Sequence, residues 1–168
     1  QREARMLMLA SGNLLKPSDG EPVTVPTQDM ILGSYYLTMV NPEDPGHGKV
    51  FRDEAEALMA YSEHIVTLQA PIKVRRTMVF DGKEESALVD TTVGNIIFNT
   101  PIPQDLGYVD RTDPAHKFDY EIGFQVTKKK LPDIISRCLT KHGTKTTAVM
   151  LDAIKAQGYK YSTLSAIT

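Results

Sequence analysis

The sequence contains a single cysteine, Cys138, and no tryptophan. One cysteine excludes a disulfide framework within the chain and any zinc site built from several cysteines. Such sparse cysteine usage suits a reducing, cytoplasmic compartment. No apolar run approaches the roughly 18 residues of a membrane span, so we expect no membrane among the partners of this chain.

The chain also lacks an excess of charge of either sign. Its 19 Lys and Arg against 21 Asp and Glu give a net charge of −2. A free-standing nucleic-acid binder is more often strongly basic overall. The charge balance therefore argues against binding nucleic acid through the net charge of the chain, but it does not exclude a local basic strip. Hydrophobic residues make up 41% of the 168 residues, which is enough for a buried core and excludes a globally disordered chain.

No self-contained catalytic or metal-binding constellation stands out. A Gly-rich phosphate-binding loop is missing, and the four histidines have no metal-ligand spacing. Cys138 and His142 are four residues apart. On a helix this spacing would allow a Cys–His nucleophile pair, as in a hydrolase. Cys138 falls in an apolar helical stripe, however, which favours a buried and inert thiol. We therefore predict no catalytic residue and no metal ligand in this segment.

The pattern of elements predicts an α+β fold. A loop-rich, mixed β portion lies between an N-terminal helix and a C-terminal αα-hairpin, whose helices are broken at His142-Gly143. A helical turn followed by an extended stretch is predicted for residues 30–40. The other helices are expected at 1–10, 52–64, 131–141 and 144–157, the strands at 22–26, 72–80 and 87–99, and the loops at 41–48 and 101–114.

Local signals add detail to two of these elements. Asp53 is a suitable N-cap for the helix at 52–64, whose buried face is predicted to carry Ala55, Leu58 and Met59. Asp81-Gly82 is a strong hairpin turn signal after the strand at 72–80. That strand is predicted to place Ile72, Val74 and Arg76 on one face.

Lys73 and Arg75 then share the opposite face of the same strand. Two interpretations stay open from the pattern: the pair lines a charged channel, or it forms the solvated face of a half-buried sheet. A second basic run, residues 128–130, precedes a predicted helix, and a solvated face is the favoured interpretation there.

Two blocks of residues resemble a known family. Residues 3–8 read Glu-Ala-Arg-Met-Leu-Met, and residues 13–38 follow the pattern N-x-L-x-P-x-x-G-x-P-x-x-x-P-x-Q-D-x-x-L-G-x-Y-Y-x-T. Residues 73–75 (Lys-Val-Arg) and 90–94 (Asp-Thr-Thr-Val-Gly) continue the match. The chain resembles the largest-subunit family of multisubunit DNA-directed RNA polymerases, most closely its bacterial form, the β′ subunit.

The resemblance implies a part in template-dependent RNA synthesis by nucleotidyl transfer. It implies a place just downstream of the family's N-A-D-F-D-G-D loop, whose aspartates hold the catalytic Mg²⁺ and which this chain does not contain. Residues 1–40 then correspond to the end of the catalytic barrel region, and residues 41–168 to a pore-domain-like segment that helps to wall the nucleotide-entry channel. The chain begins Gln-Arg-Glu-Ala-Arg, so we expect an excised part of a larger, multi-domain subunit, inactive alone.

The implied partners are those of the whole polymerase. They are the β, α, ω and σ subunits, the DNA template, the RNA 3′ end and nucleoside triphosphates. Gln28 and Asp29 match the family's Q-D pair next to the active centre, where Gln28 is expected to support the mobile elements that close over the nucleotide. The alternative is that this pair caps a local turn.

Four further residues are carried over by the resemblance. Asn13 matches an asparagine close to the active centre. Arg5 belongs to the family's Glu-Ala-Arg helix and, like Lys73 and Arg75, is a candidate for channel or partner contacts, with a structural salt link as the alternative for Arg5. The competing function is a stand-alone binding module derived from this region, contacting nucleic acid or a transcription regulator.

Overall fold

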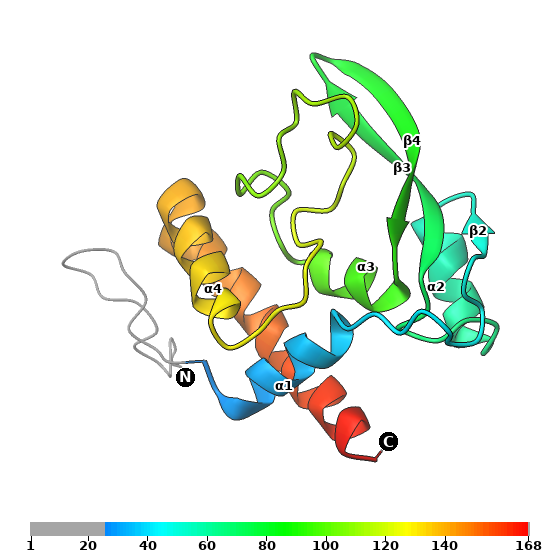
Figure 1. The fold of residues 1–168 in the computed structure, drawn as a ribbon. Helices are drawn as coiled ribbons and strands as arrows, with labels where there is room; N and C mark the ends of the chain where they lie inside the picture. Colours follow the sequence, from blue (N-terminus) through cyan, green and yellow to red (C-terminus); the bar gives the residue numbers. More distant parts are fainter. Residues whose placement is uncertain (1–25, 168) are drawn as a thin grey trace. The chain divides into compact units, whose positions relative to one another are not determined.

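The computed structural model describes residues 26–167, which form two compact units (Figure 1). The first unit contains residues 26–34 and 126–167, and the second contains Tyr35–Gln125. The helix predicted at 1–10 lies outside the described residues, as does the strand predicted at 22–26 except for Pro26. Helices together with one small mixed sheet confirm the α+β class.

The first unit is helical, with α1 (Gln28–Leu37) beginning in it and α4 (Lys130–Ile167) completing it. Gly143, with φ 86° and ψ −179°, interrupts α4. The chain turns back there, and the two halves of α4 run side by side in opposite directions (Figure 1). The predicted break at His142-Gly143 and the αα-hairpin are confirmed, because only glycine adopts this left-handed conformation readily.

The first half of α4 carries the predicted apolar stripe. Cys138 is fully buried in it, so the predicted buried state of this thiol is confirmed. The other buried members of the stripe are Leu131, Ile134, Ile135 and Leu139. The second half contributes Met150, Leu151 and Ile154 to the core.

The prediction of an extended stretch within residues 30–40 is wrong, because α1 continues to Leu37. The Thr27 hydroxyl accepts a hydrogen bond from the Met30 amide at 3.2 Å, which satisfies one of the unpaired donors at the start of the helix. Met30, Gly33 and Leu37 are buried, and their spacing of three and four residues is helical. The continuous apolar and aromatic composition of this run concealed that period.

The second unit contains a three-stranded sheet of order β2-β3-β4. β2 (Val50–Phe51) runs parallel to β3 (Ile72–Phe80), and β3 pairs antiparallel with β4 (Lys83–Thr91). Asp81 and Gly82 both have positive φ, 51° and 78°, as a two-residue hairpin turn requires. The predicted bounds of β3 and its turn are confirmed.

The single strand predicted at 87–99 is wrong, because the chain leaves the sheet at Thr91 and forms α3 (Val93–Asn99). Thr92 is the N-cap of α3, and its hydroxyl accepts from the Asn95 amide at 3.0 Å. A run of β-branched residues favours a strand. Here the threonine cap and tertiary packing override that preference.

α2 (Glu54–Ser62) begins after Asp53, whose carboxylate accepts from the Glu56 amide at 2.8 Å, as predicted for an N-cap. Its predicted buried face is wrong. Ala57 and Ala60 are the buried positions, whereas Met59 is 62% exposed. Small alanines let α2 lie close against its neighbours β2, β3 and α3. None of the helices within residues 26–167 is long and apolar enough to cross a membrane.

We predict that Thr92→Ala lowers the free energy of unfolding by about 1 kcal/mol, because the α3 N-terminus loses its capping acceptor. Urea denaturation of the chain measures the change. Thr146→Ala is the control, since Thr146 is exposed on α4 and should shift stability by less than about 0.5 kcal/mol. Equal midpoints for the two variants would contradict the capping role.

Candidate functional site

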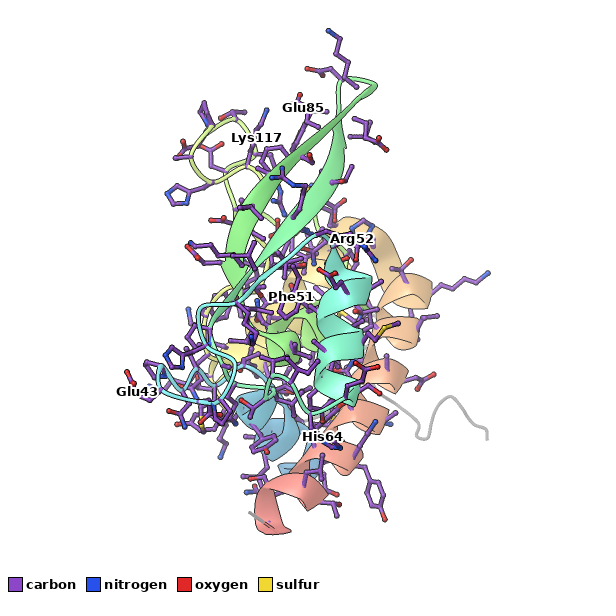
Figure 2. All side chains as sticks on the ribbon, turned by 90° about the vertical axis from the view of Figure 1, so that its right-hand side faces the viewer. Glu43, Phe51, Arg52, His64, Glu85 and Lys117 are labelled. Atoms are coloured by element: carbon purple, nitrogen blue, oxygen red, sulfur yellow. The ribbon has the colours of Figure 1, made fainter. Side chains whose placement is uncertain are left out.

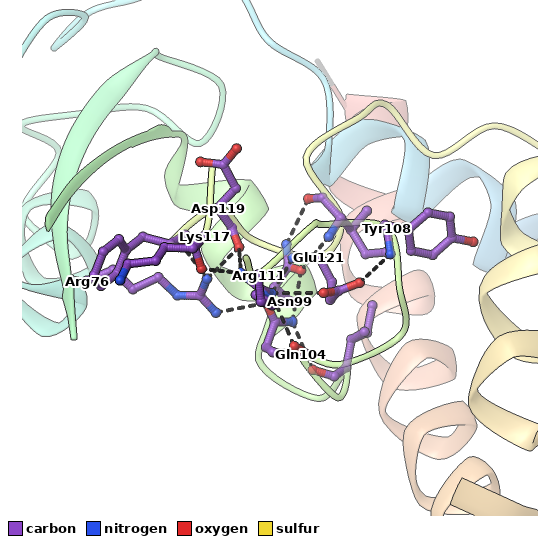
Figure 3. Close-up of polar contacts among 11 residues, drawn as sticks. Arg76, Asn99, Gln104, Tyr108, Arg111, Lys117, Asp119 and Glu121 are labelled. Carbon is purple, nitrogen blue, oxygen red and sulfur yellow. Dashed lines mark hydrogen bonds and ion pairs between the residues drawn. The ribbon is translucent and has the colours of Figure 1, made fainter. Parts of the chain in front are cut away.

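The most extensive polar cluster of the second unit is built around Arg76 on β3. Arg76 lies on the inward face of the strand, as predicted, and is only 8% exposed. One terminal nitrogen donates to the backbone carbonyls of Phe118 at 2.7 Å and Asp119 at 2.8 Å. The other donates to the side-chain oxygen of Gln104 at 2.8 Å (Figure 3). A strand residue thereby binds the loop at 101–125 at points far apart in sequence.

Arg111 makes a second set of bonds inside that loop (Figure 3). It donates to the carbonyls of Lys117 at 2.8 Å and Asp119 at 2.6 Å. Its other terminal nitrogen pairs with the Glu121 carboxylate at 2.9 Å. The Glu121 side chain is fully buried and also accepts from the Tyr108 amide at 2.8 Å. The buried charge of Glu121 therefore has both a cation and a donor as partners.

Asn99 joins the end of α3 to the same loop. Its amide donates to the Ile122 carbonyl at 3.0 Å, and its carbonyl oxygen accepts from the Ile122 amide at 3.0 Å. Gln104 donates to the same Asn99 oxygen at 3.2 Å. A segment without helix or strand thus has its buried backbone groups paired by side chains.

The electrostatics around Arg76 also involve Tyr120 and Glu54. The guanidinium carbon lies 4.0 Å from the centre of the Tyr120 ring, a cation–π arrangement. The Tyr120 hydroxyl donates to the Glu54 carboxylate of α2. Burial, reinforced by that hydrogen bond, holds the pKa of Tyr120 far above its ordinary value, so the phenol stays protonated. Burial lowers the pKa of Arg76, but an arginine remains charged at any physiological pH.

Lys117 fastens the loop to the hairpin on its other side. Its ammonium group pairs with Glu85 of β4 at 2.7 Å (Figure 2) and lies 4.6 Å from the centre of the Phe80 ring. These contacts, together with the Arg76 and Arg111 cluster, form a brace rather than a reaction centre. The terminal nitrogens of both arginines donate to acceptors within the fold.

A cavity of about 620 Å³ lies between β4, the start of α3 and the loop. Tyr108 and Phe124 form an edge-to-face pair in its wall, with ring centres 5.1 Å apart. His116 stands at the same cavity and its ring nitrogen contacts the Asp119 carboxylate at 2.9 Å. That hydrogen bond and charge raise the pKa of His116. Among residues 26–167, no three His, Cys, Asp or Glu side chains form a group that could hold a metal ion.

The structure places Lys73 and Arg75 together on the outward face of β3, as their spacing predicts. Lys73 pairs with Asp90 of β4 at 2.6 Å, and both side chains are solvent-exposed. Gln28 and Asp29 lie in the first unit, exposed in the first turn of α1. Arg5 and Asn13 lie outside the described residues.

Neither Gln28 nor Asp29 supplies the capping bond of α1, because Thr27 does so. The Asp29 carboxylate instead accepts from the Ser162 hydroxyl of α4 at 3.4 Å. The sequence pattern did not predict the roles of Arg111, Glu121 and Gln104, because these residues lie in a loop with no hydrophobic periodicity. The one available signal was Arg76, a cation at an inward position of an alternating strand, which needs acceptors from elsewhere.

The residue block at 90–94 has a clear structural explanation. Asp90 pairs with Lys73, and Thr92 caps α3. Gly94 lies so close to the end of α1 that a Cβ there would stand 2.2 Å from the Leu37 carbonyl oxygen. Its amide donates to the Leu68 carbonyl at 2.9 Å. Asp90, Thr92 and Gly94 therefore each have a local role at the hairpin-to-helix junction.

Comparison with known proteins identifies the family. Residues 13–168 match the family described as RNA polymerase Rpb1, domain 3. This chain belongs to that family. The match of Rpb1 domain 3 includes the whole of both described units.

Relatives of this chain include bacterial proteins that are named DNA-directed RNA polymerase subunit beta'. The protein from Clostridium botulinum (strain ATCC 19397 / Type A) is 58% identical over 168 residues, which is 100% of this chain and 14% of the relative. Those from Clostridium novyi (strain NT) and Acetivibrio thermocellus are 56% and 54% identical over the same lengths. The chain therefore spans 14% of the length of these relatives.

We predict that Arg76→Met lowers the free energy of unfolding by about 3 kcal/mol, because buried carbonyls of the loop lose their donors. Chemical denaturation measures the loss, and limited proteolysis should show cleavage within 101–125. Arg75→Met is the matched control, since the neighbouring arginine is exposed on the other face of the same strand. Equal losses for the two variants would contradict the bracing role of Arg76.

We predict that Asp119→Asn lowers the pKa of His116, because the carboxylate is the main group that raises it. With the folded pKa above the unfolded value, the pair stabilises the protein fully below the unfolded pKa. This contribution is lost as the pH rises through the folded pKa. An NMR titration of the imidazole measures the shift, with Asp113→Asn as the weaker, purely coulombic control. An unchanged titration in Asp119→Asn would disprove the pairing.

Proposed function

We propose that this chain is a part of the β′ subunit of a DNA-directed RNA polymerase. Within the whole enzyme it serves template-dependent RNA synthesis by nucleotidyl transfer, in the cytoplasm. The main support for this proposal is that the full chain is 58% identical to a protein named as that subunit. The partners are then the β, α, ω and σ subunits, the DNA template, the RNA 3′ end and nucleoside triphosphates.

The place of the segment within the subunit is part of the same proposal. Residues 1–40 form the end of the catalytic barrel region, and residues 41–168 form a pore-domain-like wall of the nucleotide-entry channel. Gln28, Asp29 and Asn13 lie beside the active centre, whereas Arg5, Lys73 and Arg75 make channel or partner contacts. The Mg²⁺ of the parent enzyme, held by ligands outside this chain, supplies the stabilisation of the attacking and leaving oxygens.

The geometry of the second unit supports a wall rather than a reaction centre. A channel for charged nucleotides needs cationic side chains on a backbone that does not move. Lys73 and Arg75 project from β3, whose opposite face is fixed by the buried bonds of Arg76. The brace thereby holds the strand in place, while the side chains of Lys73, paired with Asp90, and of Arg75 stay exposed to solvent.

Exposed apolar side chains support a place within a larger assembly. Val50, Met59 and Ile65 are 57%, 62% and 47% exposed and line one groove beside β2 and α2. Adjoining exposed apolar side chains of this kind are typical of surfaces that other chains or segments cover. The groove belongs to the second unit, as do Lys73 and Arg75.

We predict that Lys73→Ala combined with Arg75→Ala in the full subunit raises the KM for nucleoside triphosphates in the assembled polymerase. An exposed ionic contact is worth up to about 1 kcal/mol, so the rise should be about fivefold at low salt and smaller at high salt. Steady-state elongation assays measure it. Lys83→Ala, at the exposed start of β4, is the control. If the double variant changes neither the KM nor the assembly of the subunits, Lys73 and Arg75 make neither the proposed channel contacts nor the proposed partner contacts.

The isolated chain provides a second test. It should not incorporate nucleotides on a template, because the proposed function assigns the metal ligands to the rest of the subunit. Template-dependent incorporation by the purified chain would contradict that division of labour.

A further inference from the structure

In the first unit, α1 and the second half of α4 touch through their backbones. A Cβ added to Gly33 would stand 2.5 Å from the Gly158 Cα and 2.7 Å from its carbonyl oxygen. A Cβ added to Gly158 would stand 2.8 Å from the Met30 Cα and 2.9 Å from the Asp29 carbonyl oxygen. Distances this short leave no room for any side chain at either position.

Conformational freedom does not explain these two glycines. Both lie within helices, and neither has the positive φ that marks Gly143. Glycine inside a helix is unfavourable relative to alanine. The close helix crossing is therefore the physical reason for glycine at both positions, and it outweighs their poor helix propensity.

The contact falls on the first turn of α1, where Gln28 and Asp29 are exposed. The Asp29 backbone rests directly against Gly158, and its carboxylate accepts from Ser162 one turn further along α4. Met30, the next residue, is buried. Backbone, carboxylate and buried side chain together fix the direction in which this turn presents Gln28.

We propose that Gly33 and Gly158 are positioning residues whose backbone contact sets the placement of the Gln28–Asp29 turn for nucleotide addition. This inference rests on the proposed function, which puts the turn beside the active centre. A methyl group at the crossing must separate the two helices, and the turn moves with α1. Displacements of about 1 Å at a catalytic centre can cost up to a hundredfold in rate.

The test uses full-length subunit in assembled elongation complexes, with the variants Gly158→Ala and Gly33→Ala. Single-nucleotide addition is measured over a range of nucleotide concentrations up to saturation. The amplitude reports the active fraction, the rate constant at saturation reports the step itself, and the concentration dependence gives the KM. We expect a rate constant lower by on the order of tenfold with an unchanged KM for the nucleotide. Loss of folding or assembly alone would lower the amplitude and leave the rate constant unchanged.

Two further variants sharpen the experiment. Gly123→Ala is the control, because its nearest neighbour to an added Cβ is an oxygen at 3.7 Å, an ordinary contact. Ser162→Ala adds no atom and should give a smaller fall in the rate constant. The double variant at Gly33 and Gly158 should cost less than the product of the single effects, since one separation of the helices accommodates both methyl groups.

Hydrogen exchange of α1 gives a readout that does not depend on the chemistry. Gly158→Ala should accelerate exchange in residues 28–34 of the assembled enzyme, whereas unchanged exchange and rate overturn the proposal. Faster exchange with an unchanged rate constant also overturns it, and Gln28→Ala then shows which of two claims is wrong. If Gln28→Ala lowers the rate constant, the turn acts in nucleotide addition but the glycine contact does not position it. If Gln28→Ala leaves the rate constant unchanged, the proposed place of the turn beside the active centre is wrong.

Discussion

A guanidinium buried on the inward face of a strand imposes the main constraint on the second unit. Burial of the Arg76 guanidinium is costly unless its N–H groups find hydrogen-bond acceptors, and its acceptors do not come from the sheet. The acceptors come from the loop at 101–125, through the carbonyls of Phe118 and Asp119 and the side chain of Gln104. The course of that loop is therefore tied to β3, although it has no regular structure of its own.

The same constraint explains why several charged groups can be buried together. Arg111 and Glu121 neutralise each other inside the loop, and Arg111 shares the Asp119 carbonyl with Arg76. Tyr120 stays neutral beneath the Arg76 guanidinium and binds Glu54 of α2. Breaking one member leaves others buried without partners, so the cluster acts as a unit. The outward face of the hairpin can then be specialised without disturbing the fold.

Close backbone approach is the corresponding constraint on α1. Gly33 meets Gly158 in the first unit, and Gly94 meets the Leu37 carbonyl in the second. Two of these glycines, Gly33 and Gly94, belong to the residue blocks that carry the family resemblance. Their place in a strict pattern thus follows from the space available around α1, independently of any contact with nucleotide or nucleic acid.

Local sequence patterns predicted the α+β class, the strand at 72–80 with its turn, the Asp53 cap, the break at Gly143 and the buried state of Cys138. These depend on local chemistry: alternation, positive φ, capping and helical spacing act over a few residues. Family membership could also be predicted from the sequence, because the motif at 13–38 specifies many residue types in a fixed order.

The other features depend on packing between segments that are distant in sequence. The buried face of α2, the switch from β4 to α3 and the continuation of α1 each depend on what packs against them. Arg76 bonds to the carbonyl of Asp119, 43 positions along the chain, and the Gly33–Gly158 crossing joins residues even further apart in sequence. No local pattern encodes such pairs, since the acceptor of a buried charge and the neighbour of a glycine are chosen by the fold.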